Sequence, residues 1–176
     1  MGQLFFFIKD VNQMVGKNKV KILSVWLQRG FWGVLSYRID RSLYLLIPSI
    51  YKYIRVPLTP IFILLEIYSN IEIDYHADIK GGMKILHPSA GVFIGKSVIV
   101  GENFTITGGN FIGSKRKVKL GEFYIGNNCN FGANATIIGP VILGDNIKIG
   151  ASACVVKDCI KNNTVLAGVP AIPLKT

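Results

Sequence analysis

Residues 125–155 read IGNNCNFGANATIIGPVILGDNIKIGASACV, and this stretch decides the fold of the protein. Every sixth residue in it is large and apolar: Ile125, Phe131, Ile137, Leu143, Ile149 and Val155. Glycine follows directly at four of these places, and a small or apolar residue stands four places after each. A helix repeats every 3.6 residues and a strand every 2, so a period of six belongs to neither.

The same register continues toward the N-terminus, at Ile94, Val100, Ile106 and Ile112. A period of six with inward aliphatic residues is typical of a parallel β-helix, in which three six-residue sides form one coil. Glycine suits the corners because it tolerates unusual backbone angles, and stacked coils lie about 4.8 Å apart. We therefore expect residues 71–176 to form a left-handed parallel β-helix of roughly five coils, which makes the chain mainly β.

Residues 1–70 lack this period and are expected to form an N-terminal α-helical region. In FWGVLSYRIDRSLYLL (31–46), apolar residues recur every three or four positions, which predicts a helix with one apolar face and with Arg38 and Arg41 on the other side. We expect Pro57 and Pro60 to interrupt the chain before a short helix over 61–69. Two interpretations stay open: a helical packing unit, or an apolar, basic surface that rests on an anionic membrane.

The amino-acid composition and the distribution of charges along the chain exclude some classes of protein. Half of the 176 residues are hydrophobic and 17% are charged, which excludes intrinsic disorder. The longest uncharged runs of the helical region, 42–51 and 56–65, have ten residues each, whereas a membrane-spanning helix needs about 20. The first ten residues lack the pattern of a secretory signal, so we expect a cytoplasmic protein.

The net charge of +10 favours anionic partners: nucleic acid, an acidic membrane surface or a phosphate-bearing small molecule. The sequence contains no nucleic-acid-binding motif, so no nucleic acid is expected. No metal is expected either, since there are only two histidines and the three cysteines lack metal-type spacing. We interpret Cys129, Cys154 and Cys159 as structural thiols.

Two interruptions of the period mark where function is inserted into the repeat. Nine positions separate Ile85 from Ile94, with HPSAG (87–91) between them. Thirteen positions separate Ile112 from Ile125, and the basic segment SKRKVK (114–119) lies there. An imidazole titrates near neutral pH and can act as a general base, so the two histidines, His76 and His87, are both candidates, and His87 lies in one of these interruptions.

Four segments carry a resemblance to a known family: IEIDYHADI (71–79), ILHPSAGVFIG (85–95), the repeats themselves and VVKDCIKNNTVLAGVPA (155–171). Together with the helical leader they resemble the left-handed β-helix acetyltransferases, specifically the serine-acetyltransferase-like branch that includes polysaccharide O-acetyltransferases. The resemblance covers the chain from about Phe31 to its end. It implies direct transfer of an acetyl group from acetyl-CoA to a hydroxyl group, and assembly as a homotrimer.

The resemblance also assigns roles to residues. His87 is the implied general base, and Glu72 the carboxylate that orients its imidazole. Backbone N–H groups near Gly113 are candidates for holding the thioester oxygen. The remaining implied acetyl-CoA contacts are Ser114, Ala133, Ala151, Lys157, Gly168 and Pro170, with the basic residues of 115–119 as further candidates for its phosphates.

Two departures from serine acetyltransferases shape the predicted acceptor. Those enzymes carry an Asp before the catalytic His and an Arg-His pair before the repeats resume, whereas this chain has Leu86 and Gly121-Glu122 there. We therefore expect a sugar hydroxyl of a capsule, O-antigen or exopolysaccharide, on a lipid-linked precursor, with peripheral association at the inner membrane face. The alternatives are a serine or other small-molecule O-acetyltransferase and a non-catalytic β-helical scaffold; N-acetylation of an amino sugar also stays open.

Overall fold

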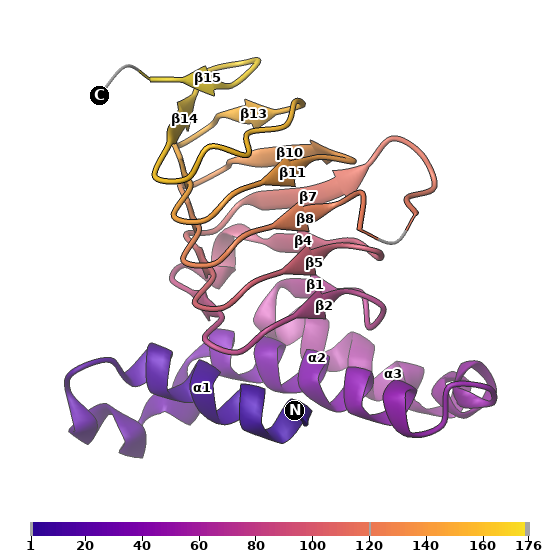
Figure 1. Cartoon of the computed structure of the whole chain (residues 1–176). Helices are drawn as coiled ribbons and strands as arrows, with labels where there is room; N and C mark the ends of the chain where they lie inside the picture. Colours follow the sequence, from indigo (N-terminus) through magenta and orange to yellow (C-terminus); the bar gives the residue numbers. More distant parts are fainter. Residues whose placement is uncertain (1, 120, 175–176) are drawn as a thin grey trace.

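The computed structural model describes residues 2–119 and 121–174, and it consists of a helical layer under one end of a β-helix (Figure 1). The helical layer contains α1 (Gln3–Val15), α2 (Arg29–Leu46) and α3 (Tyr51–Ser69). Two 3₁₀ turns, η1 (Lys19–Leu23) and η2 (Val25–Leu27), join α1 to α2. The C-terminal end of the chain lies at the far end of the β-helix from the helices.

Three parallel sheets form the sides of the β-helix. Sheet A contains β1 (Ile71–Ile73), β4 (Val92–Ile94), β7 (Asn110–Ser114), β10 (Thr136–Gly139) and β13 (Cys154–Val155). Sheet B contains β2 (Asp78–Ile79), β5 (Ile99–Val100), β8 (Tyr124–Ile125) and β11 (Ile142–Leu143). Sheet C contains β3 (Lys84–Ile85), β6 (Thr105–Ile106), β9 (Asn130–Phe131), β12 (Lys148–Ile149), β14 (Val165–Ala167) and β15 (Ile172–Pro173).

The predicted parallel β-helix with a helical N-terminal region is confirmed, at about five coils. Strands of successive coils pair in parallel, and among the described strands only β14 and β15 pair antiparallel. The residues predicted to point inward are buried: Ile94, Val100, Ile106, Ile112, Ile125, Phe131, Ile137, Leu143, Ile149 and Val155. Cys129 is buried among them, and burial raises the pKa of its thiol to about 11, as expected for a structural cysteine.

Glycines at the corners allow neighbouring coils to approach closely. A Cβ atom on Gly132 would lie 2.6 Å from the backbone nitrogen of Ala151 in the next coil. We expect Gly132→Ala to lower the free energy of unfolding by about 1–3 kcal/mol, the usual cost of overpacking. Gly150→Ala is the matched control, because the same repeat position there leaves 3.3 Å to the Ala167 side chain, and its loss should be the smaller in urea unfolding.

The buried side of α2 differs in part from the prediction, since Val34, on the predicted apolar face, is fully buried but is not joined by the rest of that face. Arg38, expected on the outer side, is 2% exposed, whereas the apolar Leu46 is 76% exposed. The first coil of the β-helix has no coil beneath it, so its backbone groups need other partners. Arg38 donates hydrogen bonds to the carbonyls of Ile79 (2.7 Å) and Lys80 (2.8 Å), and forms an ion pair with Asp10 (2.8 Å).

Other polar side chains complete this cap on the first coil. Asp10 accepts hydrogen bonds from the backbone N–H groups of Gly82 (2.8 Å) and Met83 (2.7 Å). The Tyr37 hydroxyl donates to the carbonyl of Ala77 (2.8 Å), and Arg41 donates to that of Tyr75 (2.9 Å). The helices therefore bury polar residues against the first coil together with apolar ones such as Met14 and Val34, while other apolar side chains of the helical layer stay exposed.

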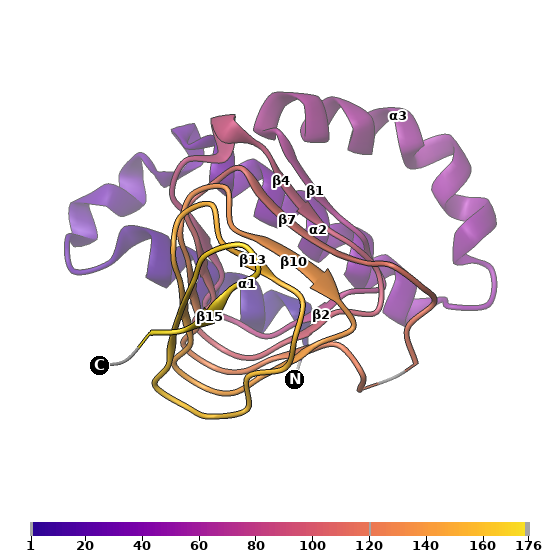
Figure 2. The same ribbon diagram turned by 90° about the horizontal axis from the view of Figure 1, so that it is seen from above.

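The helix α3 is also longer than predicted. It continues through Pro57 and Pro60, where we expected an interruption. Each proline lacks one backbone donor and bends a helix that continues through it. The Thr59 hydroxyl donates to the carbonyl of Arg55 four residues earlier (2.8 Å), a contact that also favours bending, and α3 is visibly curved in Figure 2. Among the described helices, none is long and apolar enough to cross a membrane.

Candidate active site

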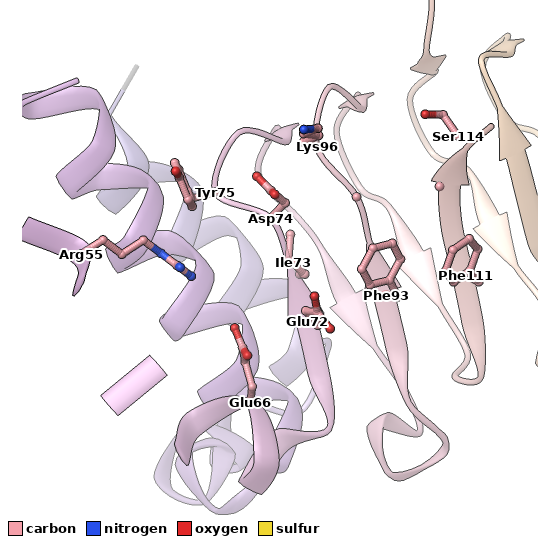
Figure 3. Close-up of a pocket in the computed structure, with 12 residues that line it drawn as sticks. Arg55, Glu66, Glu72, Ile73, Asp74, Tyr75, Phe93, Lys96, Phe111 and Ser114 are labelled. Carbon is pink, nitrogen blue, oxygen red and sulfur yellow. The ribbon is translucent and has the colours of Figure 1, made fainter. Parts of the chain in front are cut away.

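A groove of about 490 Å³ lies between α3 and the outer face of sheet A (Figure 3). Arg55 and Glu66 approach it from α3, and Glu72, Phe93 and Phe111 from the strands β1, β4 and β7. Gly113 and Ser114, at the end of β7, also line it. Three residues predicted for the site, Glu72, Gly113 and Ser114, are thus brought into one groove.

The wall of the groove is a vertical column of outward side chains. Glu72 pairs in register with Phe93, and Phe93 with Phe111, because parallel coils stack equivalent positions above one another. The two phenylalanine rings are stacked, with centroids 4.8 Å apart and an interplanar angle of 14°. The column presents a flat aromatic surface that ends in a carboxylate.

Two carboxylates face each other across the groove. Burial, and next the negative charge of Glu72, raise the pKa of Glu66 above its usual value. Arg55 lies nearby but is engaged with Asp40 (3.2 Å), and its guanidinium stands 5.1 Å from the centre of the Tyr75 ring. In the described part of the chain, neither Glu66 nor Glu72 forms an ion pair or a side-chain hydrogen bond, so both are available to a hydroxyl or cationic ligand.

His87 lies at the corner where the chain passes from sheet C to sheet A, and it does not line the groove beside Glu72. It follows β3, directly before the short 3₁₀ turn η3 (Pro88–Ala90), and its side chain is exposed. Its backbone N–H donates to the carbonyl of Thr107 (2.7 Å), which holds the corner to the next coil. Gln28 and Arg29, at the start of α2, line a second hollow of about 530 Å³ together with His87.

His87 and Glu72 line different hollows. Within residues 2–119 and 121–174, no hydrogen bond joins the two side chains. A third hollow, lined by Glu72, Ala90 and Gly91 among others, lies between them along the same corner. The pairing of these two residues therefore stays a prediction.

The other predicted residues divide between two edges of the β-helix. The chain passes from sheet C to sheet A at His87, Ala133 and Ala151, and from sheet A to sheet B at Ser114 and Lys157. Gly168 and Pro170 lie in the turn between β14 and β15 of sheet C, where the carbonyl of Gly168 accepts a hydrogen bond from the backbone N–H of Cys154 in sheet A (3.0 Å). Lys157 and Ala151 are exposed, and Gly168 has φ +94°, in the range that favours glycine. Sheet A separates the two edges, so a ligand lying along one edge of a single chain reaches only one of the two sets.

The sequence analysis missed Phe93, Phe111, Arg55 and Glu66. Phe93 and Phe111 carry a signal, since both stand one residue before an inward isoleucine, on successive strands of sheet A. Arg55 and Glu66 carry none, because only the packing of α3 beside sheet A places them at the groove. In the part of the chain that the structure describes, no cluster of three or more His, Cys, Asp or Glu side chains could hold a metal ion.

Comparison with known proteins places the chain among hexapeptide-repeat folds. Residues 124–156 match a family model described as the hexapeptide repeat of succinyl-transferase. The fold is that of a hexapeptide-repeat β-helix. No curated protein matches the sequence.

The hexapeptide-repeat β-helix and its helical layer together match solved structures. Serine acetyltransferase of Neisseria gonorrhoeae aligns with 24% identity and a TM-score of 0.79, over 98% of this chain and 66% of that one. The soybean serine acetyltransferase apoenzyme aligns with 24% identity and a TM-score of 0.78, over 98% and 69%. A serine acetyltransferase in complex with coenzyme A from Brucella abortus strain S19 aligns with 22% identity and a TM-score of 0.74, over 97% and 67%. The chain thus spans about two thirds of the length of these proteins, and at these identities the likeness shows the fold.

These structures correct the predicted acceptor. We preferred a cell-surface polysaccharide, because the chain lacks charged residues that serine acetyltransferases place around the catalytic histidine. That preference was wrong: the structures that match almost the whole chain, helices included, are serine acetyltransferases, which favours the small-molecule alternative. The absence of charges at a few positions argued against one acceptor, but it carried no positive information about a polymer.

Proposed function

We propose that this protein is an acetyl-CoA-dependent O-acetyltransferase that acts on a hydroxyl group of a small molecule. The observation that carries the proposal is the combined match of helical layer and β-helix to serine acetyltransferases, one of which contains coenzyme A. The hexapeptide repeat at 124–156, which matches a transferase family model, supports it. Serine belongs among the candidate acceptors on this ground, together with other small hydroxyl compounds.

In the proposed reaction His87 is the general base. A neutral imidazole nitrogen removes the hydroxyl proton as the oxygen attacks the thioester carbonyl carbon. The carbon–sulfur bond then breaks, and the leaving thiolate takes up the proton from the imidazolium. The exposed position of His87 beside the hollow at the start of α2 leaves room for an acceptor.

The two edges of the β-helix support a homotrimer as part of this proposal. Gly113, Ser114 and Lys157 lie along one edge, and His87, Ala133, Ala151, Gly168 and Pro170 along the other or just above it. In the proposed trimer, the edge of one chain that carries Ser114 lies against the edge of the next chain that carries His87. Both sets of residues would then line one cleft between the two chains. The phosphates of the CoA moiety would then meet Lys157 and the basic residues of 115–119.

The test is binding of coenzyme A followed by acetyl transfer. We expect saturating coenzyme A to raise the melting temperature, because a ligand at 100 times its Kd adds about 2.7 kcal/mol to the free energy of unfolding. With acetyl-CoA, a thiol reagent should report CoA release that depends on an added small hydroxyl compound, serine included. Absence of both the thermal shift and any acceptor-dependent release would reject the proposed function in favour of a non-catalytic scaffold.

A further inference from the structure

The segment between α1 and α2 carries exposed apolar side chains that lie outside the hollow beside His87, which Gln28 at the end of the segment lines. Leu23 is 75% exposed, Leu27 60% and Trp26 53%. Trp26 and Leu27 line a shallow hollow with Tyr68 of α3, so the surface continues from the 3₁₀ turns onto that helix. We call this surface the apolar end face. Its members are the exposed apolar residues of the segment and the two residues of α3 at the hollow: Val20, Ile22, Leu23, Trp26, Leu27, Leu65 and Tyr68. Figures 1 and 2 both show the 3₁₀ turns at the margin of the helical layer, outside the outline of the β-helix.

The helical layer that packs against the β-helix leaves part of its apolar surface exposed. Several side chains that face the β-helix from α1 and α2 are polar, because they satisfy the open backbone groups of the first coil, and they lie beside apolar ones such as Met14 and Val34. Other apolar side chains of the same layer are exposed, among them Leu23, Trp26 and Leu27. Contiguous apolar surface of this kind marks a site of interaction with a partner or a membrane.

The charges around the apolar end face are positive. Lys17, Lys21 and Arg29 are exposed, and among the described residues none of the three forms an ion pair. The helical region has three acidic residues, of which two are buried and one is half-buried. Asp10 and Asp40 are buried in ion pairs with arginines, and Glu66 faces the groove beside sheet A.

We propose that the apolar end face docks this protein onto a bilayer surface that contains anionic lipid. The apolar residues would enter the boundary between headgroups and acyl chains, where Trp and Tyr are favoured, while the basic residues meet lipid phosphates. A lipid surface fits better than a second copy of the chain, because two copies paired through this face would bring their lysines and arginines together without acidic partners. In this proposal the protein lies on the bilayer surface, with the apolar end face toward the lipid.

Flotation of the full chain with vesicles tests this proposal independently of acetyl transfer. The probe vesicles contain phosphatidylcholine and phosphatidylglycerol at roughly 3:1, and vesicles of phosphatidylcholine alone provide the comparison. We expect at least about tenfold stronger partitioning to the anionic vesicles, reduced when the salt concentration is raised well above about 0.1 M. Equal partitioning to both compositions, or none to either, would overturn the proposal.

Matched variants locate the binding surface. The triple variant Lys17→Gln, Lys21→Gln, Arg29→Gln should bind anionic vesicles about a hundredfold more weakly, since each basic residue near the surface contributes about fivefold. Its control is Lys96→Gln, Lys148→Gln, Lys161→Gln, which has the same net charge but changes exposed residues of the β-helix, and which should bind nearly as well as the unaltered protein. Equal losses in the two triple variants would reject the apolar end face and indicate attraction by net charge alone.

A second pair of variants tests how much the exposed leucines contribute to vesicle binding. Leu23→Ser with Leu27→Ser should weaken binding at least about tenfold, while Ile160→Ser, at an equally exposed site near the other end of the β-helix, should not. Circular dichroism verifies that each variant is folded. If the double variant instead splits a larger assembly in analytical ultracentrifugation and leaves vesicle binding unchanged, the face is an interface between copies and the membrane proposal is wrong.

Discussion

Replacing Arg38 with methionine is expected to lower the free energy of unfolding by about 3–5 kcal/mol. The Arg38 side chain is almost fully buried and binds the carboxylate of Asp10, the side chain of Gln3 and the carbonyls of Ile79 and Lys80. Methionine keeps most of the volume but removes the charge and every donor. The carboxylate of Asp10 would then be buried without its counter-ion, which costs far more than the ion pair itself contributes.

Urea unfolding measures this loss, and a second arginine provides the control. Arg116 forms an ion pair with Glu122 (2.9 Å) on an exposed loop, where such pairs contribute at most about 1 kcal/mol. Arg116→Met should therefore leave the midpoint nearly unchanged. A loss below about 1 kcal/mol in Arg38→Met would show that the cap on the first coil is not needed for stability.

A double-variant cycle tests whether Arg38 acts through Asp10. Asp10→Asn removes the negative charge and keeps an acceptor for the backbone N–H groups of Gly82 and Met83. Combined with Arg38→Met, it should cost less than the sum of the two single losses, because the uncompensated charge is gone. Additive losses would contradict the role assigned to the ion pair.

The second large effect is expected at His87. If the proposed function is correct, His87→Ala should lower the rate of acetyl transfer about 10²–10⁴-fold, which is the usual contribution of a general base. The fold should be unaffected, because the side chain is exposed and forms no hydrogen bond within the described residues. Thiol release with acetyl-CoA and an acceptor measures the rate, and the melting temperature checks the fold.

The other histidine is the matched control. His76 is also exposed, but its ring nitrogen is engaged with the carboxylate of Asp74 (2.8 Å) and it lies on the turn between β1 and β2. His76→Ala should retain the full rate. A folded His87→Ala protein that retains the full rate would refute the assignment of His87 as the base. Loss of activity in both variants would mean that histidine replacement acts through something other than proton removal.

A separate variant tests the prediction that Glu72 orients the imidazole of His87. Glu72→Gln keeps the shape of the side chain and removes its charge. If Glu72 orients the imidazole, the variant should lose rate without losing affinity for the acceptor. If Glu72 instead serves the groove beside Phe93 and Phe111, the KM for the acceptor should rise while kcat is retained.

The sequence by itself determined the β-helix and its interior. Inward residues such as Ile125 and Ile137 recur at a period that only one architecture satisfies, and each such residue contacts its equivalents one coil away. A pattern of this kind is local, so it can be read without knowing where distant segments lie. The interruption of the repeat at 87–91 marked the position of His87, and its role as the base is what the family resemblance implies.

Tertiary structure alone decided which way the helices face and how the candidate site is divided. The periodicity of α2 suggested an inward apolar face, but the open carbonyls of Ile79 and Lys80 required buried donors, so Arg38 lies inside and Leu46 outside. Glu66 joins Glu72 at one groove only because α3 curves past sheet A. Such arrangements depend on which distant segments of the chain meet in space. A repeat in the sequence specifies how each coil contacts the next one, but it does not specify what covers the first coil of the β-helix.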